Sequence, residues 1–248
     1  MQIENYFSRN DDRTLDITPY INSIATKLII EGDHLTSYST WLEIGVENFD
    51  IISKITYSKK FKVKIAIAPP QHLIGVVSNS SIPILSQHVD DSKIGSTTGF
   101  MIPELLKKSK VKGSLINHSE HRITNKEIQK LVLKLKELKM ISIVCVKDVA
   151  EVKKYVKLNP DFIAIEPPEL IGSGKSVSSE KPELIVKAAK AVKDANNKTK
   201  LLCGAGIVSG DDVSKAVELG SKGILVASGI IKSKNWNKII SEFAKALV

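Results

Sequence analysis

Short apolar runs of strand length alternate along the chain with longer stretches in which apolar residues recur at helical spacing. The short runs are almost continuously apolar, which is typical of parallel strands covered by helices on both faces. The pattern predicts strands at 62–68, 82–87, 114–117, 141–146, 162–165, 200–203 and 223–227. It predicts helices at 125–139, 149–157, 182–195, 211–219 and 235–248.

Strand and helix alternate so regularly that an α/β fold follows, and its size is that of one eight-stranded (β/α)8 TIM barrel. The rival is an open, doubly wound sheet. No predicted strand is followed by GxGxxG or GxxxxGK[ST], so the usual phosphate-binding loops of open sheets are missing. The sequence therefore favours the barrel.

The first 60 residues fit this pattern less well than the rest. Residues 1–32 are mostly polar and end in a turn-like Glu31-Gly32-Asp33, so we expect an N-terminal extension over 1–32 and the barrel over 33–248. Residues 41–60 read as an imperfect helix. The first strand of the barrel is accordingly expected to be atypical.

Composition excludes several classes of protein. Of the 248 residues, 42% are hydrophobic and 25% are charged, which is ordinary for a globular chain. No apolar run approaches the roughly 20 residues of a membrane span, and acidic residues replace the apolar centre of a signal peptide at the N-terminus. We therefore expect a cytoplasmic protein.

Neither the cysteines nor the histidines suggest a metal site. Cys145 and Cys203 each lie in an apolar run, where a free buried cysteine is more common than a disulfide. No CxxC or HExxH motif is present. The sequence predicts no metal.

The formal net charge is +9, and most of the excess lies between residues 104 and 157. Lys126, Lys130 and Lys134 there lie opposite an apolar helical stripe, which indicates a solvated helix face. Aromatic residues make up only 5% of the chain. We therefore expect no nucleic-acid partner.

In a barrel the chemistry lies where strands end, so the polar residues that close the apolar runs are the candidates. Four such ends stand out, at 117–122, 166–174, 204–207 and 227–229. Glu166 ends a strand, where a carboxylate is costly unless it is paired or used. His118 follows another strand, and either residue alone is more often structural than catalytic.

Together, a carboxylate and a histidine on one rim can take a proton from carbon while the histidine polarises a neighbouring carbonyl. The turns at Gly206, Ala227 and Ser228 offer backbone N–H groups to an anion, although ordinary tight turns would look similar. The segment 167–174 pairs stiff prolines with small residues, as a hinged lid or a plain surface loop would.

Three stretches together resemble the triosephosphate isomerase family in its compact archaeal form, namely Asn117-His118-Ser119-Glu120, Glu166 to Gly174 and Cys203 to Ile207. The motifs Gln87-His88-Val89-Asp90 and Gly95-Ser96-Thr97-Thr98-Gly99 extend the resemblance, which runs from about residue 62 to the C-terminus. It implies interconversion of dihydroxyacetone phosphate and D-glyceraldehyde 3-phosphate through an enediolate, in glycolysis and gluconeogenesis.

The same resemblance implies a role for each candidate residue. Glu166 would be the base and neutral His118 the electrophile, without metal or organic cofactor. Asn117, Glu120 and Arg122 would support the histidine. Ile171 and Gly172 would belong to the lid. Gly206, Ala227 and Ser228 would bind the phosphate. A homotetramer or homodimer is also implied.

One part of the family pattern is absent. The best register sets Ser37 and Ser39 where the family has Asn-x-Lys on the first strand, so the expected cation is missing. Another lysine, such as Lys27, could replace it; the chain could instead be a catalytically impaired phosphate-binding relative; or the N-terminal stretch could be misassigned. The sequence leaves these alternatives open.

Overall fold

The computed structural model describes residues 27–32, 63–77, 82–195 and 198–248. Its strands form one sheet in the order β2-β1-β8-β7-β6-β5-β4-β3. The strands are β1 (Lys27–Gly32), β2 (Val63–Ala68), β3 (Leu85–Ser86), β4 (Gly113–Ile116), β5 (Ile141–Val146), β6 (Phe162–Ile165), β7 (Lys200–Gly204) and β8 (Gly223–Val226). The seven strands predicted after residue 60 are thus confirmed, with β3 shorter than expected.

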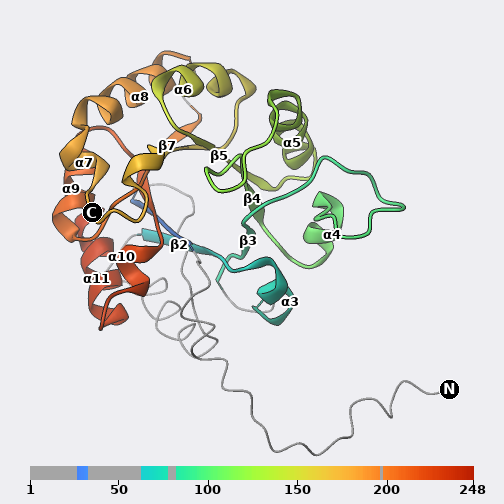
Figure 1. The fold of residues 1–248 in the computed structure, drawn as a ribbon, viewed down its shortest axis with the longest axis horizontal. Helices are drawn as coiled ribbons and strands as arrows, with labels where there is room; N and C mark the ends of the chain where they lie inside the picture. The colour runs from blue at the N-terminus through green and yellow to red at the C-terminus, as the bar shows by residue number, and fades with distance from the viewer. Residues whose placement is uncertain (1–26, 33–62, 78–81, 196–197) are drawn as a thin grey trace, which may run out of the picture.

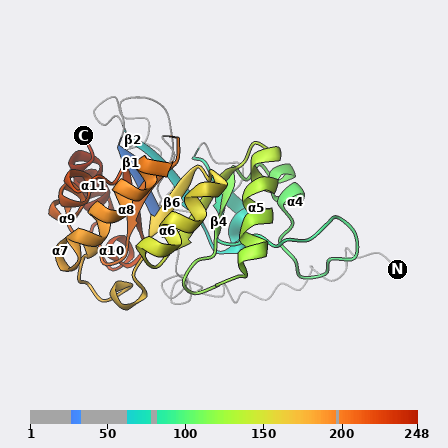
Figure 2. The same ribbon diagram turned by 90° about the horizontal axis from the view of Figure 1, so that it is seen from above.

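The sheet curls until its two end strands meet. Strands β3 to β8 run parallel, each beside the next in sequence. Strands β2 and β3 are joined by a parallel bridge between Ile67 and Ile84, and the Ile67 N–H donates to the Pro83 carbonyl at 2.9 Å. Helices surround the sheet on the outside (Figures 1 and 2). The predicted TIM-barrel architecture is confirmed.

The helices follow the strands as the spacing predicts. The α-helices are α3 (Ile74–Val77), α4 (Pro103–Lys108), α5 (Asn125–Glu137), α6 (Val149–Tyr155), α7 (Val177–Glu180), α8 (Pro182–Ala195), α9 (Gly210–Glu218), α10 (Ser228–Ile231) and α11 (Trp236–Ala246). Within the described part of the chain, 3-10 helices accompany them at η3 (Gln71–Leu73), η4 (Val156–Leu158) and η5 (Pro168–Leu170).

Amphipathic patterning and capping explain why these helices form where they do. Helix α5 buries Ile128, Leu131, Val132 and Leu135 and exposes its lysines. Its capping box pairs Thr124 with Glu127, and that of α9 pairs Ser209 with Asp212. Each box satisfies two backbone N–H groups that the first turn leaves without partners. The capping boxes thereby fix the first residues of the two helices, Asn125 in α5 and Gly210 in α9.

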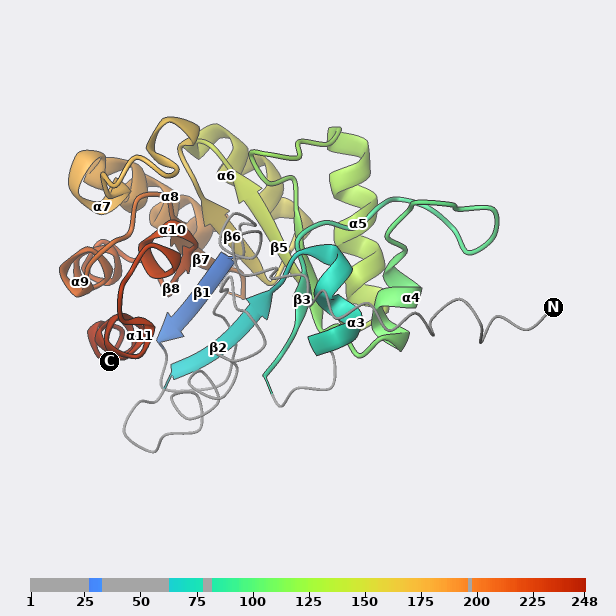
Figure 3. The same ribbon diagram turned by 60° about the horizontal axis from the view of Figure 1, so that its bottom comes forward.

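Strand β1 differs from the expected architecture. It lies between β2 and β8, where a barrel needs its first strand, but it runs antiparallel to both. Figure 3 shows its arrow pointing against that of β2. An antiparallel strand satisfies the backbone hydrogen bonds of its two neighbours as well as a parallel one does, so the sheet still closes. The parallel first strand that a (β/α)8 barrel implies is therefore not what this chain forms.

The reversed direction determines which end of β1 lies at the catalytic rim. Lys27, its first residue, is opposite Ala68, the last residue of β2, and Leu28 is opposite Val226, the last residue of β8. The start of β1 therefore lies at the carboxyl ends of the parallel strands.

The predicted division into an extension over 1–32 and a barrel over 33–248 stays a prediction. Within the first of these segments, the described piece Lys27–Gly32 is a strand of the sheet. The expected helix at 41–60, together with Ser37 and Ser39, lies outside the described residues. No helix among the described residues is long and apolar enough to cross a membrane.

Candidate active site

His118 and Glu166 come from strands two apart in the sheet and meet above its carboxyl end. His118 follows β4 by two residues, and Glu166 directly follows β6. Their side chains are 5% and 4% exposed, and His118 Nε2 lies 3.6 Å from Glu166 Oε2. The two candidates for acid–base chemistry are therefore adjacent and shielded from water.

Backbone hydrogen bonding fixes the tautomer of the His118 ring. The Glu120 N–H donates to Nδ1 at 3.2 Å, so Nδ1 acts as an acceptor and the proton of the neutral ring is on Nε2. The Glu120 carboxylate also lies 3.4 Å from Nδ1, but it is 65% exposed, and water screens it. The backbone donor therefore determines the tautomer and leaves Nε2–H on the side of Glu166.

Hydrogen bonds and an ion pair hold the loop that carries His118 in place. Asn117 adopts a left-handed backbone with φ of 66°, and its side chain donates to the Cys145 carbonyl at 3.1 Å and accepts from the Ile123 N–H at 3.2 Å. Arg122 donates to the Asn117 carbonyl at 3.5 Å and forms an ion pair with Glu151. Asn117 and Arg122 thus connect the histidine loop to β5 and α6.

Two residues at this loop were not among the sequence candidates. Glu151 on α6 accepts from the Lys147 N–H at 3.0 Å as well as binding Arg122, so it ties the histidine loop to the end of β5. The sequence gives no sign of this role, because Glu151 lies on a helix and only the fold brings it close to Arg122. The Ser119 hydroxyl is buried and has no hydrogen-bond partner among the described residues, although it stands inside the recognised motif.

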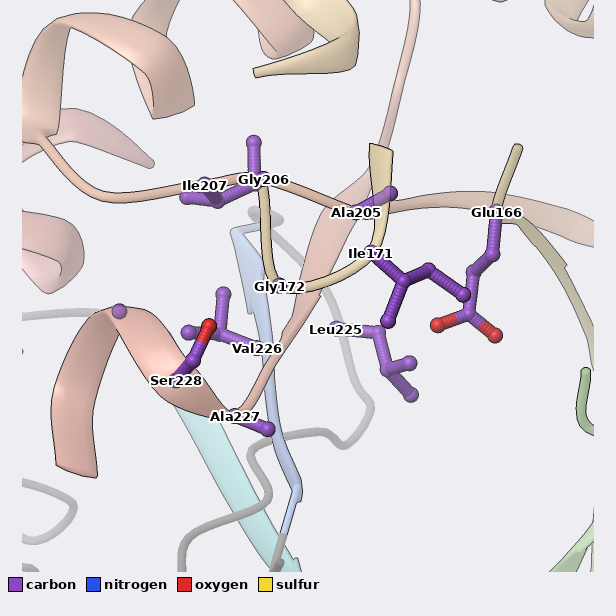
Figure 4. A pocket seen from close by; sticks show the side chains of 11 residues that line it. Glu166, Ile171, Gly172, Ala205, Gly206, Ile207, Leu225, Val226, Ala227 and Ser228 are labelled. Atoms are coloured by element: carbon purple, nitrogen blue, oxygen red, sulfur yellow. The ribbon is translucent and has the colours of Figure 1, made fainter. Parts of the chain in front are cut away.

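A small cavity adjoins Glu166 (Figure 4). Its volume is about 40 Å³, with room for only a few water molecules. The lid segment contributes Ile171 and Gly172. The lining is completed by the turn after β7, the end of β8 and the residues after β8: Ala205, Gly206, Ile207, Leu225, Val226, Ala227, Ser228 and Gly229. The candidate lid and phosphate-binding residues therefore gather around one space, with the lid lying over it.

The turn after β7 explains one glycine in this group. Ala205 and Gly206 have φ of 84° and 72°, and positive φ at a non-glycine residue such as Ala205 is a strain typical of functional sites. A Cβ on residue 206 would lie 1.8 Å from the Lys175 carbonyl oxygen. Glycine at 206 therefore allows Lys175 and Ser176, which form the second stem of the lid, to lie against the turn after β7.

The thiols near the site are not nucleophiles. Cys145 and Cys203 are both free and buried. Burial raises the pKa of the Cys203 thiol, with the Asp212 and Glu166 charges adding to the shift, so this group stays neutral. Among the described residues no cluster of histidine, cysteine and carboxylate side chains is arranged to hold a metal ion.

Comparison with known proteins identifies the family. The triosephosphate isomerase family model matches residues 45–243. The chain belongs to the triosephosphate isomerase family. A triosephosphate isomerase of Cenarchaeum symbiosum is 59% identical over 188 residues, covering 76% of this chain and 84% of the relative.

More distant archaeal relatives extend the match. The Methanothermus fervidus triosephosphate isomerase is 48% identical over 186 residues, covering 75% of this chain and 84% of the relative. That of Methanobrevibacter smithii is 38% identical over 216 residues, covering 86% and 97%. The chain is thus a triosephosphate isomerase, an intramolecular oxidoreductase, and glycolysis and gluconeogenesis follow from the family.

The packing of Glu166 against Gly204 yields a direct test of the geometry. A Cβ on residue 204 would lie 2.5 Å from Glu166 Cγ and 2.9 Å from Oε1. We expect Gly204→Ala to displace the carboxylate and lower kcat by about 10²-fold, as a misplacement of roughly 1 Å does. Gly75→Ala in α3 is the control, because its Cβ would meet nothing within 4 Å. Unchanged kcat in a folded Gly204→Ala protein would contradict the placement.

Proposed function

We propose that Glu166 is the base and His118 the electrophile in the isomerisation of a triose phosphate. The observation that carries this proposal is the buried contact of 3.6 Å between His118 Nε2 and Glu166 Oε2. A substrate carbon placed beside Glu166 loses a proton to the carboxylate, while the Nε2–H of His118 donates to the adjacent carbonyl oxygen.

The reaction balances without any cofactor. Glu166 takes the proton from C1 of dihydroxyacetone phosphate, and the electron pair moves into an enediolate between C1 and C2. The same carboxyl group returns a proton to C2, while a proton passes from the oxygen on C1 to the oxygen on C2. We place this reaction in the cytoplasm, where glycolysis and gluconeogenesis run.

The phosphate would be held at the small cavity beside Glu166. We assign its binding to backbone N–H groups of Gly206, Ala227 and Ser228, which line that space together. Ile171 and Gly172 would close over it and keep water from the enediolate. The cavity is too small for a triose phosphate while the lid is down, so the lid must lift to admit substrate.

Removing the base tests the mechanism. We expect Glu166→Gln to lower kcat by at least about 10³-fold in a coupled assay with D-glyceraldehyde 3-phosphate, because the amide cannot accept the carbon proton. Glu183→Gln, an exposed substitution on α8, is the matched control and should keep full turnover. A well-folded wild-type protein without turnover above the spontaneous rate would leave a phosphate-binding relative as the better description.

The charge of the site requires a cation. The described residues that line the cavity include the Glu166 carboxylate and no lysine or arginine. A phosphate dianion and an enediolate in a water-excluded site would repel that carboxylate unless positive charge lies nearby. Strand β1 starts with Lys27 at this rim, next to the last residues of β2 and β8. We therefore propose that Lys27 replaces the missing lysine of the Asn-x-Lys pattern.

Substitution of Lys27 tests this assignment. We expect Lys27→Ala to lower kcat/KM by about 10²- to 10³-fold and to weaken inhibition by inorganic phosphate, while Lys27→Arg keeps part of both. The control is Lys222→Ala, an exposed lysine just before β8 at the opposite end of the sheet. If Lys27→Ala behaves like Lys222→Ala, the assignment of Lys27 is wrong.

We also propose a homo-oligomer, a tetramer or a dimer. The segment between β3 and α4 projects beyond the ring of helices in all three views (Figures 1 to 3), and it carries Ile94 at 62% and Phe100 at 53% exposure. Large apolar side chains on a projecting segment suit burial against another copy.

Light scattering tests this assembly. We expect wild-type protein to show the mass of two or four chains, and Ile94→Ser with Phe100→Ser to shift it towards one. Val186→Ser is the control, because this exposed valine lies on α8. A monomeric wild-type protein would contradict the proposal.

A further inference from the structure

The two ends of the lid are linked by an ion pair. Glu169 lies in η5, at the first stem of the lid, and Lys181 caps the end of α7, beyond the second stem. The Lys181 ammonium donates to Glu169 Oε1. The contact spans the whole segment that covers the cavity.

The Lys181 end of this pair is fixed to the barrel. At the start of α7 the Val177 N–H donates to the Ala205 carbonyl at 3.3 Å, and the buried Ser178 hydroxyl donates to the Asp212 carbonyl at 3.0 Å. Helix α7 is thereby tied both to the turn after β7 and to α9. These contacts hold the start of the short helix that ends at Lys181.

The Glu169 end belongs to the part that must move. It lies two residues before Ile171 and three before Gly172, whose position over the cavity leaves no room for substrate. Lifting those residues changes the stem at Pro167 and η5, and Glu169 moves with it. When the lid is down, the ion pair therefore joins Glu169, on the moving stem, to Lys181, at the end of the anchored helix α7.

We propose that Glu169 and Lys181 form a latch that sets how much of the time the lid is down. This inference rests on the proposed function, because it assigns a use to the lid of that site. Both are positioning residues: they contact neither the cavity nor the residues proposed to react. Their effect on catalysis is exerted through Ile171 and Gly172.

The strength of the pair suits a latch that opens in every turnover. The side chains of Glu169 and Lys181 are 56% and 40% exposed, and exposed pairs change an equilibrium by only about two- to fivefold. The hydrogen bond from Lys181 holds the pKa of the Glu169 carboxyl below its usual range, so the pair stays charged at neutral pH. Its loss should shift the lid towards the lifted state without unfolding the barrel.

Trypsin cleavage after Lys175 measures the lid without any substrate. Lys175 is exposed in the second half of the lid, and cleavage requires this segment to leave its place on the β7 turn. When trypsin cuts more slowly than the lid recloses, the rate of cleavage is proportional to the fraction of molecules with a lifted lid. We expect Glu169→Gln and Lys181→Gln each to speed this cut about two- to fivefold, and Lys181→Arg to match the wild type.

A double-mutant cycle separates a pair from two independent effects. Glu169→Gln with Lys181→Gln should be cut no faster than either single variant, because the interaction is already lost in each. Lys190→Gln on α8 removes a similarly exposed ion pair, with Asp194 at 2.8 Å, and should not change the rate. Residue 181 precedes a proline, so its substitution removes no good tryptic site.

Kinetics of the same variants then connect the latch to catalysis. We expect both single variants to lower kcat/KM about two- to fivefold and to raise the fraction of enediolate that loses phosphate to water, an escape that a closed lid prevents. Unchanged cleavage in both single variants, or effects that multiply in the double variant, would overturn the latch. An inactive wild-type protein with the expected cleavage pattern would overturn the proposed function and leave the latch standing.

Discussion

The site depends on a buried carboxylate held beside a histidine ring. Glu166 is 4% exposed, and a carboxylate so far from water costs free energy unless hydrogen bonds and nearby positive charge compensate. The barrel ends β4 and β6 at one rim, so that His118 Nε2 lies 3.6 Å from Glu166 Oε2. The carboxylate is thus shielded from water at the place from which we propose that it removes a proton from carbon.

The surrounding structure serves to keep that pair in place. Behind His118, the left-handed Asn117 and the Arg122–Glu151 ion pair fix the loop, and the Glu120 N–H fixes the ring tautomer. Beside Glu166, a glycine at 204 leaves room for the carboxylate. Ile171 and Gly172 line the cavity beside it, where we propose that they exclude water and so strengthen the electrostatic interactions beneath. The antiparallel β1 starts with Lys27 at the same rim, and we propose that this lysine supplies the positive charge that the site needs.

The sequence predicted most of the fold, because near-continuous apolar runs and capping motifs are local signals. Strands β5 and β6 have the predicted bounds, and α5 begins at the predicted Asn125, directly after the Thr124 of its capping box. Strand β1 and its direction were missed, since only Leu28, Ile29 and Ile30 within Lys27–Gly32 are apolar and the pairing of the strand depends on distant strands. Glu151 and Lys181 were missed for a related reason: a charged residue on a helix has no distinguishing pattern until the fold supplies its partner.

The most direct test of proton transfer by Glu166 is isomerisation of D-glyceraldehyde 3-phosphate in D₂O, with the product followed by proton NMR. A single carboxyl base that holds the proton between two carbons exchanges part of it with solvent. We predict that a substantial share of the dihydroxyacetone phosphate carries deuterium at C1. Conversion in which all product keeps the hydrogen of the substrate would indicate direct hydride transfer and contradict the account.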